Sequence, residues 1–153
     1  MNDARQQVTL PPVVKTVTVA LGIEAAFRRF TEGIATWWPM HSHSVGQEQT
    51  VSVVLERSTG GRLYERLADG AEHDWGRITA WEPPTLVAFT WHPGRDPSTA
   101  QRVEVRFTAQ GDGGTVVQLT HRDWERLGDD AERQRRDYDG GWERVLSLFI
   151  ETR

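Results

Sequence analysis

The stretch DDAERQRRDYDGGWERVLSLFIETR, residues 129–153, decides the fold of this chain. Its large apolar residues recur at intervals of four, three and four, as expected for one face of a helix: Tyr138, Trp142, Val145 and Phe149. Most of the charged residues fall on other faces, so the pattern predicts an amphipathic helix. The rest of the chain must then supply a surface that covers this apolar stripe.

The predicted helix begins at Asp129. Gly128, Asp129 and Asp130 favour a start there, because carboxylates pair with free backbone N–H groups and with the positive end of the helix. Gly140 and Gly141 lie in the helix interior, where each costs about 1 kcal/mol relative to alanine. The pair therefore predicts a kink, or a close approach of the helix backbone to a sheet or cavity beneath it.

The composition restricts the class of protein. A length of 153 residues predicts one domain with a substantial core, and a net charge of −4 gives no basic surface of the kind that nucleic acids require. There is no cysteine, which excludes disulfides and thiolate sites and is typical of a reducing compartment. The sequence has no bilayer-length apolar run and no signal peptide at its start, so we expect a cytoplasmic protein without membrane insertion.

The first part of the chain alternates between strand and helix patterns. Residues 1–12 are polar and end in two prolines, which predicts a flexible lead-in ahead of a single domain over residues 13–153. A β-branched run predicts a first strand, and a change of period then predicts two short helical pieces; these elements are expected at 13–20, 22–29 and 31–35. Pro39 ends any helix there and leaves Trp37 and Trp38 at its end.

Six further strands are expected as three hairpins. Glycine-rich or proline-rich turns lie within each hairpin, at 58–61, 82–84 and 111–114. The strands are expected at 50–56, 62–67, 72–81, 85–92, 101–109 and 115–123. One strand, two short helices, six strands and a closing helix predict an α+β fold in which a strongly bent antiparallel sheet wraps around the last helix.

Several short strings occur in a fixed order along the chain: FRRF at 27–30, WWP at 37–39, GGRL at 60–63, GRI at 76–78, WEPP at 81–84, VAFTW at 87–91, Gly113 with LTH at 119–121, and GW at 141–142. As an ordered set they resemble the START-like helix-grip superfamily (SRPBCC), and within it the domain named after the activator of heat-shock protein 90 ATPase. The resemblance covers the chain from Val13 onward. It implies a curved sheet of about seven strands, an internal cavity under the closing helix, and apolar or amphipathic ligands, with no shared catalytic set and no cofactor.

The chain has seven tryptophans, more than a core of this size ordinarily uses, which predicts a cavity or contact surface lined by aromatic rings. At least one of these rings is expected to pack as plain core. The residues expected to bind a ligand are Trp37, Trp38, Tyr64, Trp75, Phe89, Trp91, Phe107, His121, Trp124, Tyr138 and Trp142.

His121 is the residue for which two interpretations matter most. By strand alternation it shares a face with Val117 and Leu119, which points it toward the inner side of the sheet. It is either a buried histidine held by a hydrogen-bond partner, or a polar or acid–base group with a tuned pKa among apolar walls.

His41 and His43 are candidate metal ligands, because imidazoles two residues apart in an extended segment point the same way. No third ligand follows at a recognisable spacing, so no metal site is expected. The sequence also contains no nucleophile elbow, phosphate-binding loop or dinucleotide fingerprint.

Three classes of function remain. The leading one is a protein that binds a small apolar or amphipathic molecule in the aromatic cavity. The second is an enzyme of the cyclase, hydratase or hydrolase kind that uses the same cavity, with His121 and acidic groups as candidates. The third is a chaperone-interacting module, which predicts an exposed apolar patch; eukaryotic activators carry a further domain ahead of this one, so activation of the ATPase itself is not expected.

Overall fold

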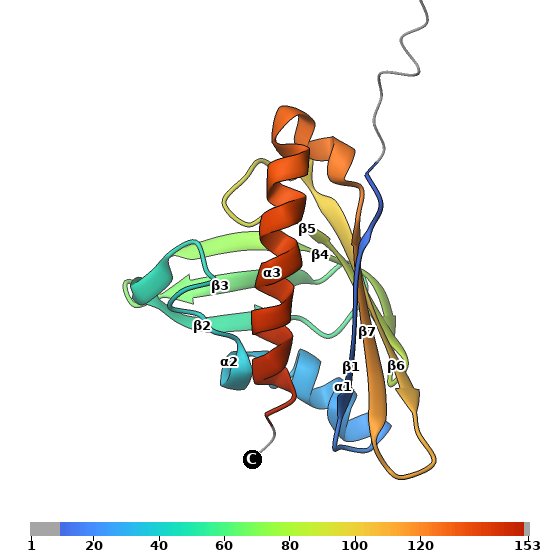
Figure 1. Ribbon diagram of the computed structural model, residues 1–153. Coiled ribbons are helices and arrows are strands. Elements are labelled where there is room, and N and C mark those ends of the chain that lie inside the picture. The colour runs from blue at the N-terminus through green and yellow to red at the C-terminus, as the bar shows by residue number, and fades with distance from the viewer. Residues whose placement is uncertain (1–9, 152–153) are drawn as a thin grey trace, which may run out of the picture.

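The computed structural model describes residues 10–151, so most of the predicted lead-in lies outside it (Figure 1). The helices of these residues are α1 (Ile23–Thr31), α2 (Ile34–Trp37) and α3 (Ala131–Phe149), with short 3-10 turns η2 (Gln47–Gln49), η3 (Pro97–Thr99) and η4 (Trp124–Asp130). The strands are β1 (Val13–Val19), β2 (Thr50–Leu55), β3 (Arg62–Leu67), β4 (Glu72–Glu82), β5 (Leu86–Trp91), β6 (Gln101–Ala109) and β7 (Thr115–Arg122).

All seven strands form one antiparallel sheet in the order β1-β7-β6-β5-β4-β3-β2. The sheet curls so that its two ends reach forward on either side of α3, which runs across the concave face (Figure 1). The predicted α+β helix-grip fold is therefore confirmed. Strand ends agree with the prediction to within one residue, because the glycine and proline turns mark them directly.

The core lies between the concave face and the helices. In β6 the side chains of Val103, Val105 and Phe107 are buried and alternate with the charged residues Arg102, Glu104 and Arg106. Phe107 packs edge-on against Phe27 and Phe30 of α1, with ring centroids 5.1 and 5.9 Å apart. α1 thus covers one end of the curled sheet, where Phe30 also packs against Phe149 of α3 with ring centroids 5.4 Å apart.

The start of α3 differs from the prediction. The 3-10 turn η4 occupies residues 124–130, and the α-helix begins at Ala131. Gly128 has a positive φ of 60°, which breaks the helical path before Asp129. Asp130 makes no side-chain capping bond, because its carboxylate accepts from Arg95 and Arg133 instead.

The interpretation of Gly140 and Gly141 as a point of close approach is wrong. α3 runs unbroken through both, without a visible kink (Figure 1). A Cβ added at either glycine would meet nothing within 4 Å. The bulky neighbouring ring of Trp142 holds this part of the helix away from the sheet, so that Gly141 borders open space.

Close backbone approach occurs instead at Gly76 of β4. A Cβ there would lie 1.8 Å from the carbonyl oxygen of Thr90 in β5. The β4 backbone is irregular on both sides of this point, where its pairing with β3 and with β5 shifts register. Only glycine lets the two strands come this close while Trp75 and Trp91 lie with ring centroids 5.5 Å apart.

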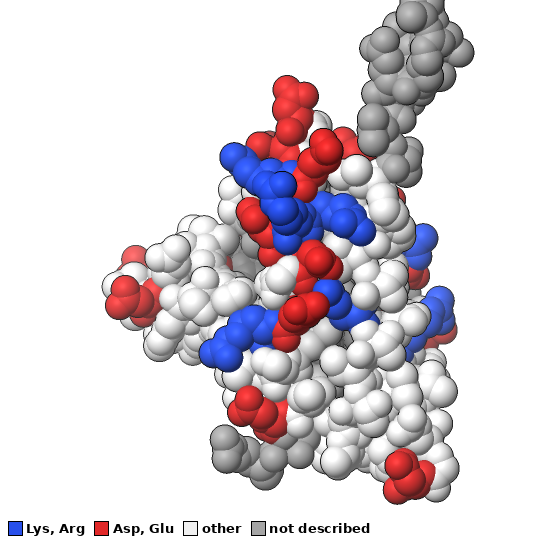
Figure 2. Space-filling view, in the orientation of Figure 1, with Lys and Arg blue, Asp and Glu red and all other residues white. Residues whose placement is uncertain are grey.

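Charged side chains of both signs interleave along the exposed face of α3 (Figure 2). Lys15 of β1 reaches across to this face and pairs with Asp139 and Glu143, each at 2.8 Å. Within residues 10–151 no helix is long and apolar enough to cross a membrane.

Candidate functional site

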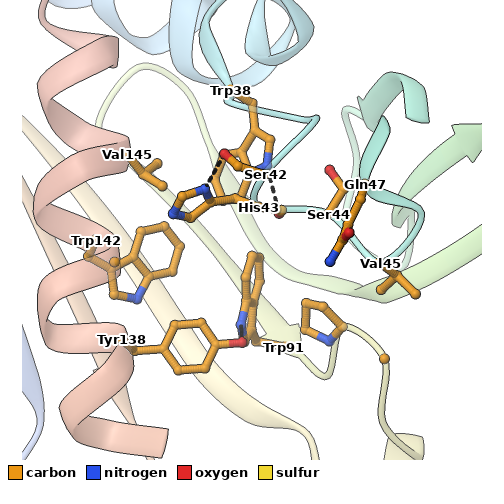
Figure 3. A pocket seen from close by; sticks show the side chains of 13 residues that line it. Trp38, Ser42, His43, Ser44, Val45, Gln47, Trp91, Tyr138, Trp142 and Val145 are labelled. Atoms are coloured by element: carbon orange, nitrogen blue, oxygen red, sulfur yellow. Dashed lines mark hydrogen bonds between the residues drawn. The ribbon is translucent and has the colours of Figure 1, made fainter. Parts of the chain in front are cut away.

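An open cavity of about 390 Å³ lies between α3 and the segment that joins α2 to β2 (Figure 3). Three parts of the chain line it: Trp38 with the segment of residues 42–47, the end of β5 with the loop after it, and one face of α3. The lining residues are Trp38, Ser42, His43, Ser44, Val45, Gln47, Trp91, Pro93, Gly94, Tyr138, Gly141, Trp142 and Val145.

Three indoles and one phenol form the aromatic wall of this cavity. The ring centroids of Trp91 and Trp142 lie 5.3 Å apart, and Trp38 is 5.9 Å from Trp142 and 6.1 Å from Trp91. The indole N–H of Trp91 donates to the hydroxyl oxygen of Tyr138 at 3.0 Å. Mutual packing and this hydrogen bond fix the relative positions of the four rings.

Of the eleven residues expected to bind a ligand, the structure therefore places four on the cavity: Trp38, Trp91, Tyr138 and Trp142. Trp75 and Phe89 lie behind this wall, with Trp75 packed against Trp38 at 5.2 Å and Phe89 against Trp91 at 5.9 Å. These two rings support the wall from the sheet side.

The remaining predicted residues lie elsewhere. Trp37 and Phe107 pack around Phe30 in the core below the cavity. Tyr64 lies beneath the guanidinium of Arg62, 3.9 Å from its ring centroid, and its hydroxyl accepts from Arg66. The extra residue at the pairing irregularity between β3 and β4 is Trp75 of β4, so alternation along β3 is regular and places Tyr64 on the opposite face from Leu63 and Glu65.

His121 is buried beside the cavity wall, with both ring nitrogens engaged. The Trp142 indole N–H donates to Nδ1 at 3.0 Å, and Nε2 lies 3.1 Å from Oε1 of Gln101. An indole can only donate, so Nδ1 carries no proton and Nε2–H donates to Gln101. The Gln101 amide in turn donates to the carbonyl of Thr99. Trp124 stacks on the imidazole with ring centroids 4.0 Å apart.

The surroundings of His121 keep it neutral. Burial lowers the pKa of its imidazole from 6.5 to about 3, because the charged form would lose its hydration without gaining a counter-ion. With both nitrogens paired and the ring outside the cavity lining, His121 offers no free atom to a ligand. Its position fits the interpretation as a buried, hydrogen-bonded histidine that orients Trp142.

Glu65 is a residue that the sequence analysis missed. Its side chain is fully buried, and its two carboxylate oxygens accept four hydrogen bonds, which come from Val45 N (2.7 Å), Gly46 N (2.6 Å), Thr50 Oγ1 (3.1 Å) and Trp75 Nε1 (2.6 Å). The carboxylate thus ties the segment of residues 42–47 to the sheet. A glutamate between Tyr64 and Arg66 gives no sequence signal for such a role, because its donors come from distant parts of the chain.

The segment of residues 42–47 supplies the polar side of the cavity. Oγ of Ser42 lies 2.7 Å from Nδ1 of His43. Ser44 has a buried hydroxyl with no hydrogen-bond partner in the described structure. Partial burial, and then the guanidinium of Arg144, lower the pKa of His43 below its ordinary value of 6.5. The cavity therefore has an apolar aromatic wall and an opposing polar edge that is uncharged at neutral pH.

The pair His41 and His43 does not build a metal site. His41 is exposed, whereas His43 lines the cavity and contacts Ser42. Within residues 10–151 no group of three or more histidine, aspartate or glutamate side chains could hold an ion.

The family described as "Activator of Hsp90 ATPase homolog 1-like protein" matches the chain over residues 21–152. The chain belongs to this family. A search of curated proteins found no match.

Solved structures extend the comparison. The chain is 35% identical to a structure described as "An anthrahydroquino-Gama-pyrone synthase Txn09 complexed with SUM", with 94% of this chain and 90% of that chain covered and a TM-score of 0.58. It is 29% identical to a self-sacrificing resistance protein, CalC from Micromonospora echinospora, with 92% of each chain covered and a TM-score of 0.70. The Bacillus halodurans protein BH1534, at 20% identity, 94% and 100% coverage and a TM-score of 0.66, shares the fold.

Proposed function

We propose that this protein binds a planar, polycyclic aromatic molecule with oxygen substituents in the cavity between α3 and residues 42–47. The observation that carries the proposal is the wall of Trp38, Trp91 and Trp142 on an open cavity. Indole faces bind flat, apolar rings by offset stacking or edge contacts. The volume of about 390 Å³ falls within the range of roughly 300–1,000 Å³ that small-molecule sites occupy.

The polar edge of the cavity supports oxygen substituents on the ligand. The polar side chains of Ser42 and Gln47 line the cavity on this edge and are exposed. The amide of Gln47 can donate to a ligand carbonyl or accept from a ligand hydroxyl. No carboxylate or guanidinium lines the cavity, so an uncharged ligand fits better than an ion.

The similar proteins agree with a ligand of this class. The 35% identical relative is described as a synthase of an anthrahydroquino-γ-pyrone, and the 29% identical relative as a resistance protein. The first description names a polycyclic product, and it supports binding of a small molecule over a purely structural role.

An interaction module for a chaperone has less support. The large apolar side chains that are exposed within residues 10–151 are Val14, Val45, Val51 and Ile150. Val14 lies on β1 and Val51 on β2, which are the two opposite edge strands of the sheet, whereas a docking surface requires a contiguous apolar patch.

Titration with 1,8-dihydroxyanthraquinone, followed by quenching of tryptophan fluorescence, tests the proposal. Gly141→Leu places a side chain in the cavity mouth, where a Cβ meets no protein atom within 4 Å. We expect this variant to bind at least about tenfold more weakly, a loss of about 1.4 kcal/mol.

Gly140→Leu is the matched control, because Gly140 is exposed and outside the cavity lining. Both substitutions raise helix propensity by about 0.8–1 kcal/mol, so neither is expected to unfold α3. Equal affinity of the two variants, or no binding by the unmodified protein, would contradict the proposal.

A further inference from the structure

His43 is a second histidine at the cavity, and unlike His121 it has a free nitrogen. Its ring lines the cavity above Trp142 (Figure 3), and Nδ1 contacts Ser42 at 2.7 Å. Nε2 has no partner within residues 10–151, the part of the chain that the structure describes. The sequence offered His43 only as a metal ligand, and the structure gives it a different set of neighbours.

The contacts of Ser42 determine which nitrogen of His43 holds the proton. The Ser42 hydroxyl lies 3.3 Å from the carbonyl oxygen of Pro39, which can only accept. Ser42 has one proton, so both contacts are satisfied when it donates to Pro39 and accepts from Nδ1–H of His43. In this arrangement Nε2 keeps its lone pair and can take a proton from a ligand.

Tyr138 is a proton donor on the other side of the cavity, across from His43 (Figure 3). Its oxygen accepts the Trp91 indole N–H, and an indole cannot accept in return. The phenolic proton is therefore available to a ligand. Burial raises the pKa of Tyr138 above 10, so the phenol stays protonated at neutral pH.

We propose that the cavity catalyses enolisation of a planar aromatic ketone, with His43 as the proton acceptor and Tyr138 as the proton donor. The inference rests on the proposed function, because it needs the ligand class bound there. His43 Nε2 removes a proton from the carbon next to, or conjugated with, the carbonyl group. The C–H electron pair forms a C=C bond, the C=O electrons move to oxygen, and that oxygen takes the proton of Tyr138. The ketone becomes its enol, and the proton on His43 then passes through solvent in the open cavity to the Tyr138 phenolate, which restores both groups without consuming another reactant.

The charges around His43 suit this role. Partial burial disfavours the imidazolium form and lowers the pKa of His43, and the guanidinium of Arg144 on α3 adds to this effect. Tyr138 on the same helix stays neutral, and the Glu65 carboxylate behind the segment is engaged by four donors. His43 is therefore present as the free base at neutral pH. A positioned general base contributes about 100- to 10,000-fold in rate.

Anthrone, a three-ring ketone that enolises to anthrol, provides the test. The full chain is mixed with anthrone in D₂O without oxygen, and exchange of its CH₂ protons for deuterium is followed by NMR. Binding is measured in parallel by tryptophan quenching. We expect exchange faster than in buffer alone. Binding without faster exchange would overturn this inference and leave the binding proposal intact, whereas absence of anthrone binding would count against both.

His43→Gln is expected to slow exchange by about 100-fold or more with little change in anthrone affinity. His41→Gln is the matched control: His41 is exposed and outside the cavity lining, so exchange should not change. Equal rates for the two variants would overturn the role of His43.

Tyr138→Phe keeps the ring but removes the donor, and it should also slow exchange. Because Ser42 acts through His43, Ser42→Ala should lower the exchange rate and Ser42→Thr, which keeps the hydroxyl, should restore it. If His43→Gln does not fold, the Tyr138→Phe and Ser42→Ala variants still test the proposal. Unchanged exchange rates in both would contradict the roles of His43 as proton acceptor and Tyr138 as proton donor.

Discussion

Replacing Glu65 with glutamine is expected to remove one of the hydrogen bonds that hold residues 42–47 against the sheet, while the other hydrogen bonds remain. In the structure one carboxylate oxygen accepts from Val45 N and Trp75 Nε1, and the other accepts from Gly46 N and Thr50 Oγ1. A glutamine can place its carbonyl oxygen at the first position. Its NH₂ group then donates to the Thr50 hydroxyl, which can also accept, but faces the N–H of Gly46.

The magnitude follows from this one conflict. Leaving a buried donor without a partner costs about 1–3 kcal/mol, so the free energy of unfolding of Glu65→Gln should fall by about that amount. The loss should be local to Gly46, because the bonds to Val45 and Trp75 have an acceptor in the variant. Since residues 42–47 form the polar side of the cavity, affinity for 1,8-dihydroxyanthraquinone should fall as well.

Urea unfolding measures the stability, and amide hydrogen exchange by NMR measures the local effect. We expect faster exchange at Gly46 and nearly unchanged exchange at Val45. Glu48→Gln, at an exposed glutamate of η2, is the control and should leave both measurements unchanged. Unaltered protection of Gly46 together with an unaltered unfolding midpoint would refute the assignment of Glu65 as the anchor of this segment.

Two further predictions concern stability. The pKa of His121 is about 3 in the folded protein and about 6.5 when unfolded. The stability that the neutral imidazole contributes to the fold is therefore fully present above about pH 6.5. This stability is lost as the pH falls toward 3, by up to about 1.4 kcal/mol per pH unit. His121→Phe should have a lower free energy of unfolding at pH 7, but its urea midpoint should decline less steeply as the pH falls. A decline as steep as that of the unmodified protein would contradict this reasoning. Gly76→Ala should lower the free energy of unfolding by about 3 kcal/mol or more, because its Cβ would overlap the Thr90 carbonyl. Gly111→Ala is the control and should not lower it, because a Cβ there has nothing within 4 Å. Similar denaturation midpoints for these two variants would show that β4 and β5 can separate at little cost in free energy.

The order and approximate limits of the strands could be predicted because turn residues act locally. The glycine and proline clusters fix chain reversals through their own backbone preferences, independently of distant contacts. The apolar stripe of α3 likewise follows from helical periodicity, and it identified Tyr138 and Trp142, which both line the cavity. The tryptophan count indicated an aromatic wall but gave no way to distinguish Trp38 and Trp91 from the rings behind them.

The sequence by itself thus determined the helix-grip fold, the apolar face of its closing helix and the presence of many aromatic rings near that face. Only the tertiary structure decided which rings border open space and which polar atoms are left without partners. Glu65 illustrates the reason, since its four donors lie ten to twenty positions away and meet only when the sheet curls. His43 and His121 illustrate it as well: both are histidines near the same cavity, and the neighbours brought by folding leave a free nitrogen on one and none on the other.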